Sequence, residues 1–109
     1  MNWISLTTAD QIQHIESDRM NQFIVIFKHS TRCSISSMIL HRLEREQSPD
    51  NIDFYFLDLI KYRELSHAIA AQFDVQHESP QILLIKNGKC IYNESHNGIS
   101  LQALIAEAS

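Results

Sequence analysis

The chain has 109 residues, of which 44% are hydrophobic and 20% charged, and its 2 Gly and 2 Pro form no linker, so we expect one domain over residues 1–109. A formal net charge of −4, with 9 Lys and Arg spread singly along the chain, argues against nucleic acid as a partner. No apolar run is long enough to cross a membrane, and two cysteines without a CxxC pair suit a reducing compartment, so we expect a cytoplasmic protein with free thiols.

The first elements are predicted to be a short strand and a helix. The strand is expected at Trp3 to Leu6. Thr8 followed by Gln11 has the spacing of a helix capping box, and Ile12 and Ile15 then recur at helical intervals. These features predict a helix that starts just after Thr8.

The middle of the chain continues to alternate strands with helices. The apolar run from Phe23 to Phe27 lacks alternation, which is typical of a central strand that is covered on both faces. A helix is expected from Ser34 to Gln47 and a second strand from Ile52 to Leu59, with Met38 and the strand aromatics in the core. The following helix is defined by three apolar residues at helical spacing: Leu65, Ile69 and Phe73.

The last third predicts a hairpin and a final helix. Asn87-Gly88 is a strong hairpin signal, because both turn positions need a positive φ, and it joins strands at 82–85 and 90–92. Ser100 can cap a helix with a buried stripe at Leu101, Leu104 and Ile105. The fold class is therefore α/β, with a mixed central sheet sandwiched by helices.

Cys33 is the main candidate for chemistry. It follows the central strand and opens a helix, where unpaired N–H groups and the positive end of the helix dipole favour a thiolate. Arg32, Lys28 and His29 are expected to favour the thiolate too. The alternative is a buried structural cysteine, which the polar neighbours Arg32 and Ser34 disfavour.

The residue three positions after Cys33 is Ser36, so the pattern is CxxS and provides no resolving thiol beside Cys33. The oxidised form of Cys33 is therefore expected to be a mixed disulfide with an external thiol. The pattern alone is weak in a serine-rich chain. It gains weight from its place between a buried strand and a helix.

Cys90 is predicted to be too distant to act as the resolving thiol. The two-residue hairpin turn places Cys90 opposite Ile85 and Ser95 opposite Pro80. If Pro80 lies beside Cys33, Cys90 is five strand residues away, or about 16 Å. That distance exceeds the Cα separation of about 7 Å that a disulfide tolerates. We therefore interpret Cys90 as a half-buried strand residue.

The same register brings His96 to the Pro80 end of the hairpin. Two interpretations stay open for it: an ordinary surface histidine, or a hydrogen-bond donor or cation toward a bound thiol. The other histidines show no ligand spacing with one another or with the cysteines, so no metal site is expected. They are His14, His29, His41, His67 and His77.

Taken together, the order of elements, the Cys at a strand-to-helix turn and the segment from Glu78 to Gly88 resemble the thioredoxin-like fold over nearly the whole chain. More narrowly, Phe27-Lys28-His29-Ser30-Thr31-Arg32-Cys33-Ser34-Ile35-Ser36 and Ser79-Pro80-Gln81, followed by Ser95-His96, resemble the YtxJ-like monothiol bacilliredoxins.

The resemblance implies a cis Pro80 and a redox nucleophile at Cys33 that removes bacillithiol from S-bacillithiolated proteins. Ser36 and the first-turn amides would stabilise the sulfur anion, and the backbone of Ser79 would hold an extended substrate. Bacillithiol would be a cosubstrate, with no tightly bound cofactor. Its malate part carries two carboxylates, for which Arg32 and His96 are the expected donors, with His29 behind them.

Two positions depart from the family motif Thr-Cys-Pro-Ile-Ser. Arg32 stands between Thr31 and Cys33, and Ser34 replaces the proline. Arg32 adds a charge beside the thiol, and Ser34 restores a backbone N–H near the sulfur, which favours the thiolate.

Two other functions stay open at this point. One is a glutathione-using enzyme like the monothiol glutaredoxins, some of which share an iron–sulfur cluster between two copies, although no second ligand is evident in this chain. The other is a non-catalytic thioredoxin-like binding module, in which Cys33 is a bystander and the Pro80 surface binds a partner. The mass of a thiol adduct and the reactivity of Cys33 distinguish them.

Overall fold

The computed structural model describes residues 1–18 and 23–108. In this part of the chain no helix is both long and apolar enough to cross a membrane. The elements, in chain order, are β1 (Trp3–Ser5), α1 (Ala9–Ser17), β2 (Phe23–His29), α2 (Ser34–Glu44), β3 (Ile52–Asp58), α3 (Arg63–Gln72), β4 (Gln81–Lys86), β5 (Lys89–Ser95), the 3₁₀ turn η1 (His96–Gly98) and α4 (Leu101–Glu107).

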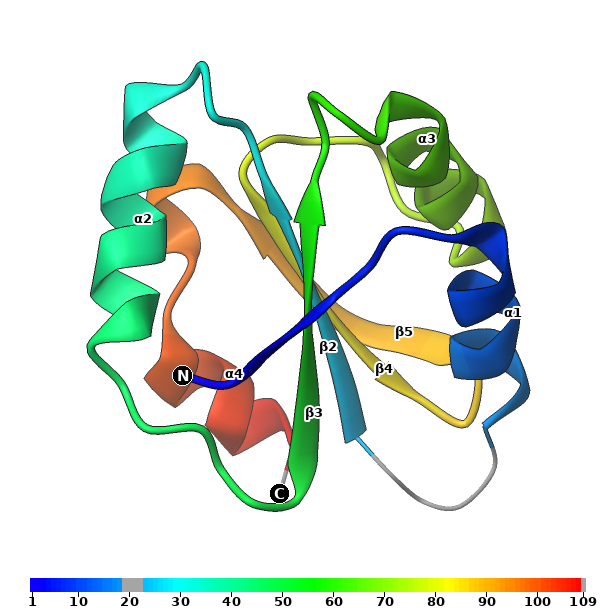
Figure 1. Ribbon diagram of the computed structural model, residues 1–109. Coiled ribbons are helices and arrows are strands. Elements are labelled where there is room, and N and C mark those ends of the chain that lie inside the picture. The colour runs from blue at the N-terminus through cyan, green and yellow to red at the C-terminus, as the bar shows by residue number, and fades with distance from the viewer. Residues whose placement is uncertain (19–22, 109) are drawn as a thin grey trace.

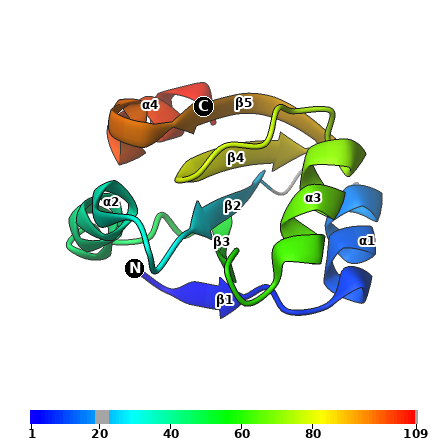
Figure 2. The ribbon, with the colours of Figure 1, turned by 90° about the horizontal axis from the view of Figure 1, so that it is seen from above.

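The strands of the described residues form one mixed sheet in the order β1-β3-β2-β4-β5. Strands β1, β3 and β2 run parallel, whereas β4 is antiparallel to β2 and β5 to β4. Helices α2 and α4 cover one face of the sheet, and α1 and α3 cover the other (Figures 1 and 2). The predicted α/β architecture, a mixed sheet sandwiched by helices with the 23–27 strand at its centre, is confirmed.

The buried side chains divide into two cores, one on each face of the sheet. Successive residues of β2 alternate between them, because side chains along a strand point to opposite faces. Val25 and Phe27 belong to the core under α2 and α4, whereas Ile24 and Ile26 belong to the core under α1 and α3. This alternation explains the unbroken apolar run in β2, and it decides where the polar residues that follow point.

The predicted helix starts are confirmed. The Thr8 hydroxyl accepts the N–H of Gln11 at 3.3 Å, and the Gln11 side chain accepts the N–H of Thr8 at 3.1 Å, which completes the capping box. The Ser100 hydroxyl accepts the N–H of Ala103 at 3.3 Å at the start of α4. These bonds satisfy first-turn N–H groups that have no partner within the helix.

The hairpin turn is also confirmed, with positive φ at Asn87 (53°) and Gly88 (77°). Its register is correct near the turn, where Cys90 faces Ile85, and wrong beyond it. A β-bulge separates this pair from Leu84, which faces Tyr92, so Ser95 lies opposite Gln81 and not opposite Pro80. The extra residue also reverses the faces of β5: Cys90 packs on the α1/α3 core and Tyr92 on the α2/α4 core.

Two apolar residues that were predicted to be buried lie at the surface. Met38 is 54% exposed and Ile105 is 40% exposed. Each lies one residue from the buried stripe of its helix, which is marked by Ile39 in α2 and Leu104 in α4, and one residue turns the side chain by about 100°. Helix α2 also ends at Glu44, three residues before the predicted boundary.

Candidate active site

The predicted site residues meet at one end of the sheet. Lys28 near the end of β2 pairs with Gln81 at the start of β4, so the segment that leaves β2 and the segment that enters β4 lie at the same end of the sheet. This end is at the top of Figure 1. The first segment carries Cys33, and the second carries Pro80, whose peptide bond with Ser79 is cis. The predicted cis proline is confirmed.

Cys33 is the N-cap residue of α2. Its backbone is extended, with φ −114° and ψ 119°, and its carbonyl accepts the N–H of Ser37 at 3.1 Å. Its own N–H donates to the carbonyl of Ser30 at 3.2 Å, which closes the turn between β2 and α2. The residue is partly exposed and its thiol is free. Its side chain makes no capping hydrogen bond with the first-turn N–H groups of α2.

Ser36 is completely buried below Cys33. Its hydroxyl oxygen accepts the backbone N–H of Ser30 at 3.0 Å and shares a hydrogen bond of 2.7 Å with Nδ1 of His29. These bonds join α2 to the end of β2 and so hold the turn that carries Cys33. A direct bond from the Ser36 hydroxyl to the sulfur anion stays a prediction.

His29 lies in the interior on the α2 side of the sheet, where it is 5% exposed. Burial lowers its pKa, and the opposing influence of Asp58, Glu44 and a hydrogen bond with the Ser36 backbone does not cancel this effect. His29 is therefore neutral at pH 7. A buried and neutral ring does not supply the positive charge that was expected to favour the Cys33 thiolate. It also does not serve as a further cation, after Arg32 and His96, for the carboxylates of the small thiol.

We expect Ser36→Ala to lower the free energy of unfolding by about 2 kcal/mol, because it leaves the Ser30 N–H and the His29 ring without their buried partner. Urea denaturation measures this change. Ser37→Ala is the matched control, since it removes a hydroxyl one residue away that is outside this network and should change stability by less than about 0.5 kcal/mol. Equal unfolding midpoints for wild type and Ser36→Ala would contradict the structural role of this hydroxyl.

Lys28 lies on the opposite face of the sheet from α2, contrary to its predicted place beside the thiol. Strand alternation points it toward α3, where Nζ donates to the carbonyl of Ser66 at 3.1 Å and the side chain is fully buried. Burial lowers its pKa from 10.5 to about 8. The Ser66 hydroxyl in turn bonds Nε2 of His77 at 2.8 Å, three residues before Pro80. Lys28 is therefore linked, through Ser66 and His77, to the segment that precedes Pro80.

The predicted substrate-binding residues lie around the same end of the sheet. Arg32 and Ser34 flank Cys33 and are exposed, whereas Ser79 is half-buried and Pro80 is buried. The hydroxyl oxygen of Ser79 is buried without a hydrogen-bond partner among residues 1–18 and 23–108. His96 is exposed, has a φ of 56°, and its N–H donates to the carbonyl of Pro80 at 3.0 Å. This bond brings His96 to Pro80, although the bulge altered the predicted register.

Cys90 lies toward the hairpin turn, at the opposite end of β4 and β5 from Pro80. It faces Ile85, five residues after Pro80, which corresponds to about 16 Å along the strand. Its thiol donates to the carbonyl of Tyr92 at 3.3 Å. Burial raises the pKa of this thiol, so less thiolate forms at neutral pH.

A family model described as "Monothiol bacilliredoxin BrxC" matches residues 4–104. The chain belongs to the monothiol bacilliredoxin family. The matched range includes the turn at Cys33, the Ser79-Pro80 peptide and His96. The family and the fold together identify a thiol oxidoreductase-like protein.

Solved structures agree with the fold. A thioredoxin-fold protein proposed to be an oxidoreductase is 29% identical, with a TM-score of 0.83 over 98% of this chain and 94% of the other. Thioredoxin from Fasciola hepatica is 20% identical, with a TM-score of 0.73 over 96% and 98% of the two chains. Thioredoxin from Trypanosoma brucei brucei is 13% identical, with a TM-score of 0.71 over 98% and 87%. The two thioredoxins support the fold alone.

Sequence reasoning missed the paired roles of His29 and Ser36 and the burial of Lys28. The spacing of seven residues between His29 and Ser36 forms no recognised motif, and their contact depends on how α2 packs against β2. Lys28 had a signal in strand alternation. It follows Phe27 in a strand that is buried on both faces, so its side chain had to enter the core opposite that of Phe27.

Proposed function

We propose that this bacilliredoxin-family chain is a monothiol thiol–disulfide oxidoreductase that removes bacillithiol from mixed disulfides on proteins. One observation carries the proposal: the N-cap residue of α2, Cys33, carries a partly exposed free thiol at the end of the sheet where the cis Pro80 also lies, with a serine and not a cysteine three residues later. A single thiol in this position can exchange disulfides but has no neighbouring thiol with which to close an internal one.

In the first step the Cys33 thiolate attacks the bacillithiol sulfur of the protein mixed disulfide. A new disulfide forms between Cys33 and bacillithiol, the original disulfide breaks, and the protein cysteine leaves as a thiolate that takes a proton from solvent. In the second step a bacillithiol thiolate attacks the bacillithiol sulfur on Cys33. This step releases the Cys33 thiolate and bacillithiol disulfide. Overall, the protein cysteine is reduced to a thiol and the one free bacillithiol that enters is oxidised; it leaves as a disulfide with the bacillithiol that came from the protein.

The surrounding residues have distinct roles in this proposal. The first-turn amides of α2, including that of Ser34, and the Ser36 hydroxyl stabilise the sulfur anion. The backbone of Ser79 holds the extended substrate protein by strand-like hydrogen bonds. Arg32 and His96 are exposed at this end of the sheet. Both provide hydrogen-bond donors for the small thiol, and Arg32 adds a positive charge.

The test is the mass of the oxidised protein. After incubation with bacillithiol disulfide we expect one bacillithiol adduct, located at Cys33 by peptide mapping and lost in Cys33→Ser. Parallel incubation with glutathione disulfide gives the comparison between small thiols. An adduct with glutathione alone would favour a glutaredoxin-like enzyme, and no adduct at Cys33 with either disulfide would favour a binding module.

A further inference from the structure

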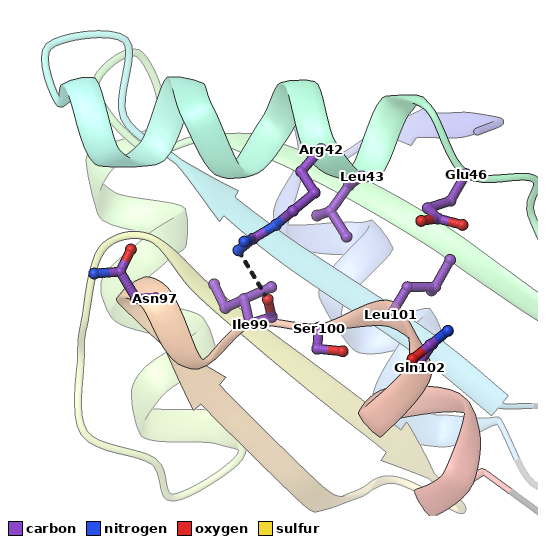
Figure 3. A pocket seen from close by; sticks show the side chains of 8 residues that line it. All are labelled: Arg42, Leu43, Glu46, Asn97, Ile99, Ser100, Leu101 and Gln102. Atoms are coloured by element: carbon purple, nitrogen blue, oxygen red, sulfur yellow. Dashed lines mark hydrogen bonds between the residues drawn. The ribbon is translucent and has the colours of Figure 1, made fainter.

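An open groove runs between α2 and the segment that joins η1 to α4. Its volume is about 270 Å³. The polar residues that line it are Arg42 and Glu46 on one side and Asn97, Ser100 and Gln102 on the other (Figure 3). This volume is close to the lower limit for small-molecule sites in proteins, about 300 Å³. It is therefore suited to part of a small ligand and too small for a folded partner.

The two walls of the groove belong to segments that start at the candidate active site. One wall is the C-terminal end of α2, the helix whose N-cap residue is Cys33, and it contributes Arg42, Leu43 and, just past the helix, Glu46. The other wall starts at η1, whose first residue, His96, donates its N–H to the carbonyl of Pro80 at 3.0 Å. In Figure 3, Asn97 lies toward the N-terminal end of α2, and Glu46 lies beyond its other end. Asn97 thus marks the end of the groove that is nearer Cys33, and the α2 side of the lining begins only at Arg42.

The chemistry of the groove favours a carboxylate near its middle. The Arg42 guanidinium points across it, and Nη2 donates to the carbonyl of Ile99 at 3.2 Å (Figure 3). A guanidinium has five N–H donors, so this bond leaves donors for a ligand, and Asn97 adds an amide. Glu46 lies at the far end, away from the guanidinium. The Glu46 carboxylate repels an anionic ligand at that end, so a bound carboxylate is favoured in the part of the groove between Arg42 and Asn97.

The distance from Cys33 to Arg42 is comparable to the length of a small thiol of three linked units. Arg42 is nine residues after Cys33, or about 13 Å along the helix axis. Its guanidinium lies nearer than that, because helical side chains lean toward the N-terminus. Bacillithiol joins cysteine, glucosamine and malate, and three extended units span about 10 Å. With its sulfur on Cys33, its malate end therefore reaches the region of Arg42 and Asn97.

We propose that this groove holds the carboxylate-bearing end of the small thiol that is joined to Cys33. The inference rests on the proposed function and adds Arg42 and Asn97 as specificity residues that act at the end distant from the sulfur. Arg42 holds a carboxylate by two parallel hydrogen bonds, and Asn97 donates its amide to the same end of the ligand.

The experiment compares one peptide in two mixed disulfides, with bacillithiol and with uncharged 2-mercaptoethanol. We expect Arg42→Ala to slow release of bacillithiol by about ten- to a hundred-fold and release of mercaptoethanol by less than about two-fold. Arg42→Lys keeps the charge and loses the two-bond geometry, so its loss should be smaller but measurable. Asn97→Ala should slow bacillithiol release by about three- to ten-fold.

Arg45→Ala is the matched control, because Arg45 is an exposed arginine of the same segment that does not line this groove. It should leave both rates within about two-fold of wild type. Glutathione, which also carries carboxylates, is the third arm. An equal loss for glutathione in Arg42→Ala would show that the groove recognises carboxylates in general, and a loss for bacillithiol alone would show that it recognises the malate end.

The outcomes separate this inference from the proposed function. If wild type releases mercaptoethanol but not bacillithiol, the proposed function fails and the inference fails with it. If wild type releases both and Arg42→Ala slows neither, slows both equally, or matches Arg45→Ala, the inference alone fails. If Arg42→Ala does not fold, Arg42→Lys and Asn97→Ala decide by the same comparison of the two disulfides.

Discussion

Cys33→Ser should reduce the release of bacillithiol from a bacillithiolated protein by roughly a thousand-fold or more, because no other thiol lies at the end of the sheet that carries Pro80. Cys90→Ser should remain within about two-fold of wild type, since Cys90 is about 16 Å along the strand from Pro80 and burial raises the pKa of its thiol. Turnover of one bacillithiolated protein with each variant measures both effects.

Peptide mapping of the oxidised wild-type protein is the complementary measurement. It should identify a small-thiol adduct on Cys33 and a free thiol at Cys90. An internal disulfide between Cys33 and Cys90 would contradict this geometry. Loss of turnover in Cys90→Ser with unchanged stability would assign the second cysteine a direct role that the register of β4 and β5 opposes.

The second large effect concerns Lys28, which is fully buried in β2. Its pKa falls from 10.5 to about 8, a difference of about 2.5 units, which corresponds to roughly 3 kcal/mol of destabilisation at neutral pH. Lys28→Met removes the buried charge and also loses the hydrogen bond to Ser66, which is worth about 1 kcal/mol. We therefore expect the variant to be more stable than wild type at pH 7 by about 2 kcal/mol.

The gain should depend on pH in a defined direction. Below pH 8 the ammonium is charged in the folded and unfolded states, and the full cost of burial is present. Between pH 8 and 10.5 the folded state loses the proton first, so wild type recovers stability and the advantage of Lys28→Met decreases.

Urea denaturation at pH 7 and at pH 10 measures the difference. Lys61→Met, which replaces an exposed lysine, is the matched control and should change stability by less than about 0.5 kcal/mol at either pH. A lower stability of Lys28→Met than of wild type at pH 7 would contradict an unfavourable buried charge.

The parts of the fold that could be predicted depend on local signals. The capping box at Thr8 and the positive φ values at Asn87-Gly88 are set by residues that are adjacent in the chain. The placement of Cys33 and Pro80 at one end of the sheet was implied by the resemblance to the thioredoxin-like fold, which rested in part on the order of strands and helices that hydrophobic periodicity indicates. For these features the sequence was sufficient.

The parts that could not be predicted depend on packing between distant segments. Nothing local marks the bulge in β5, so the register beyond it was wrong by one residue. The bond between His29 and Ser36 requires the position of α2 above β2. The groove at Arg42 exists because η1 and α4 return to α2, more than fifty residues later in the chain. Met38 is apolar and still exposed, because hydrophobic character alone does not require burial.

The bulge in β5 also has a consequence for self-association. Strand β5 is one edge of the sheet, and an edge with regular N–H and C=O groups is a template on which another chain can aggregate. The irregular pairing between Leu84 and Ile85 interrupts this template halfway along the strand. The other edge, β1, has only three residues. Both edges therefore offer little regular backbone to a second copy, and the sheet resists growth into an aggregate despite the exposed Ile91 on β5.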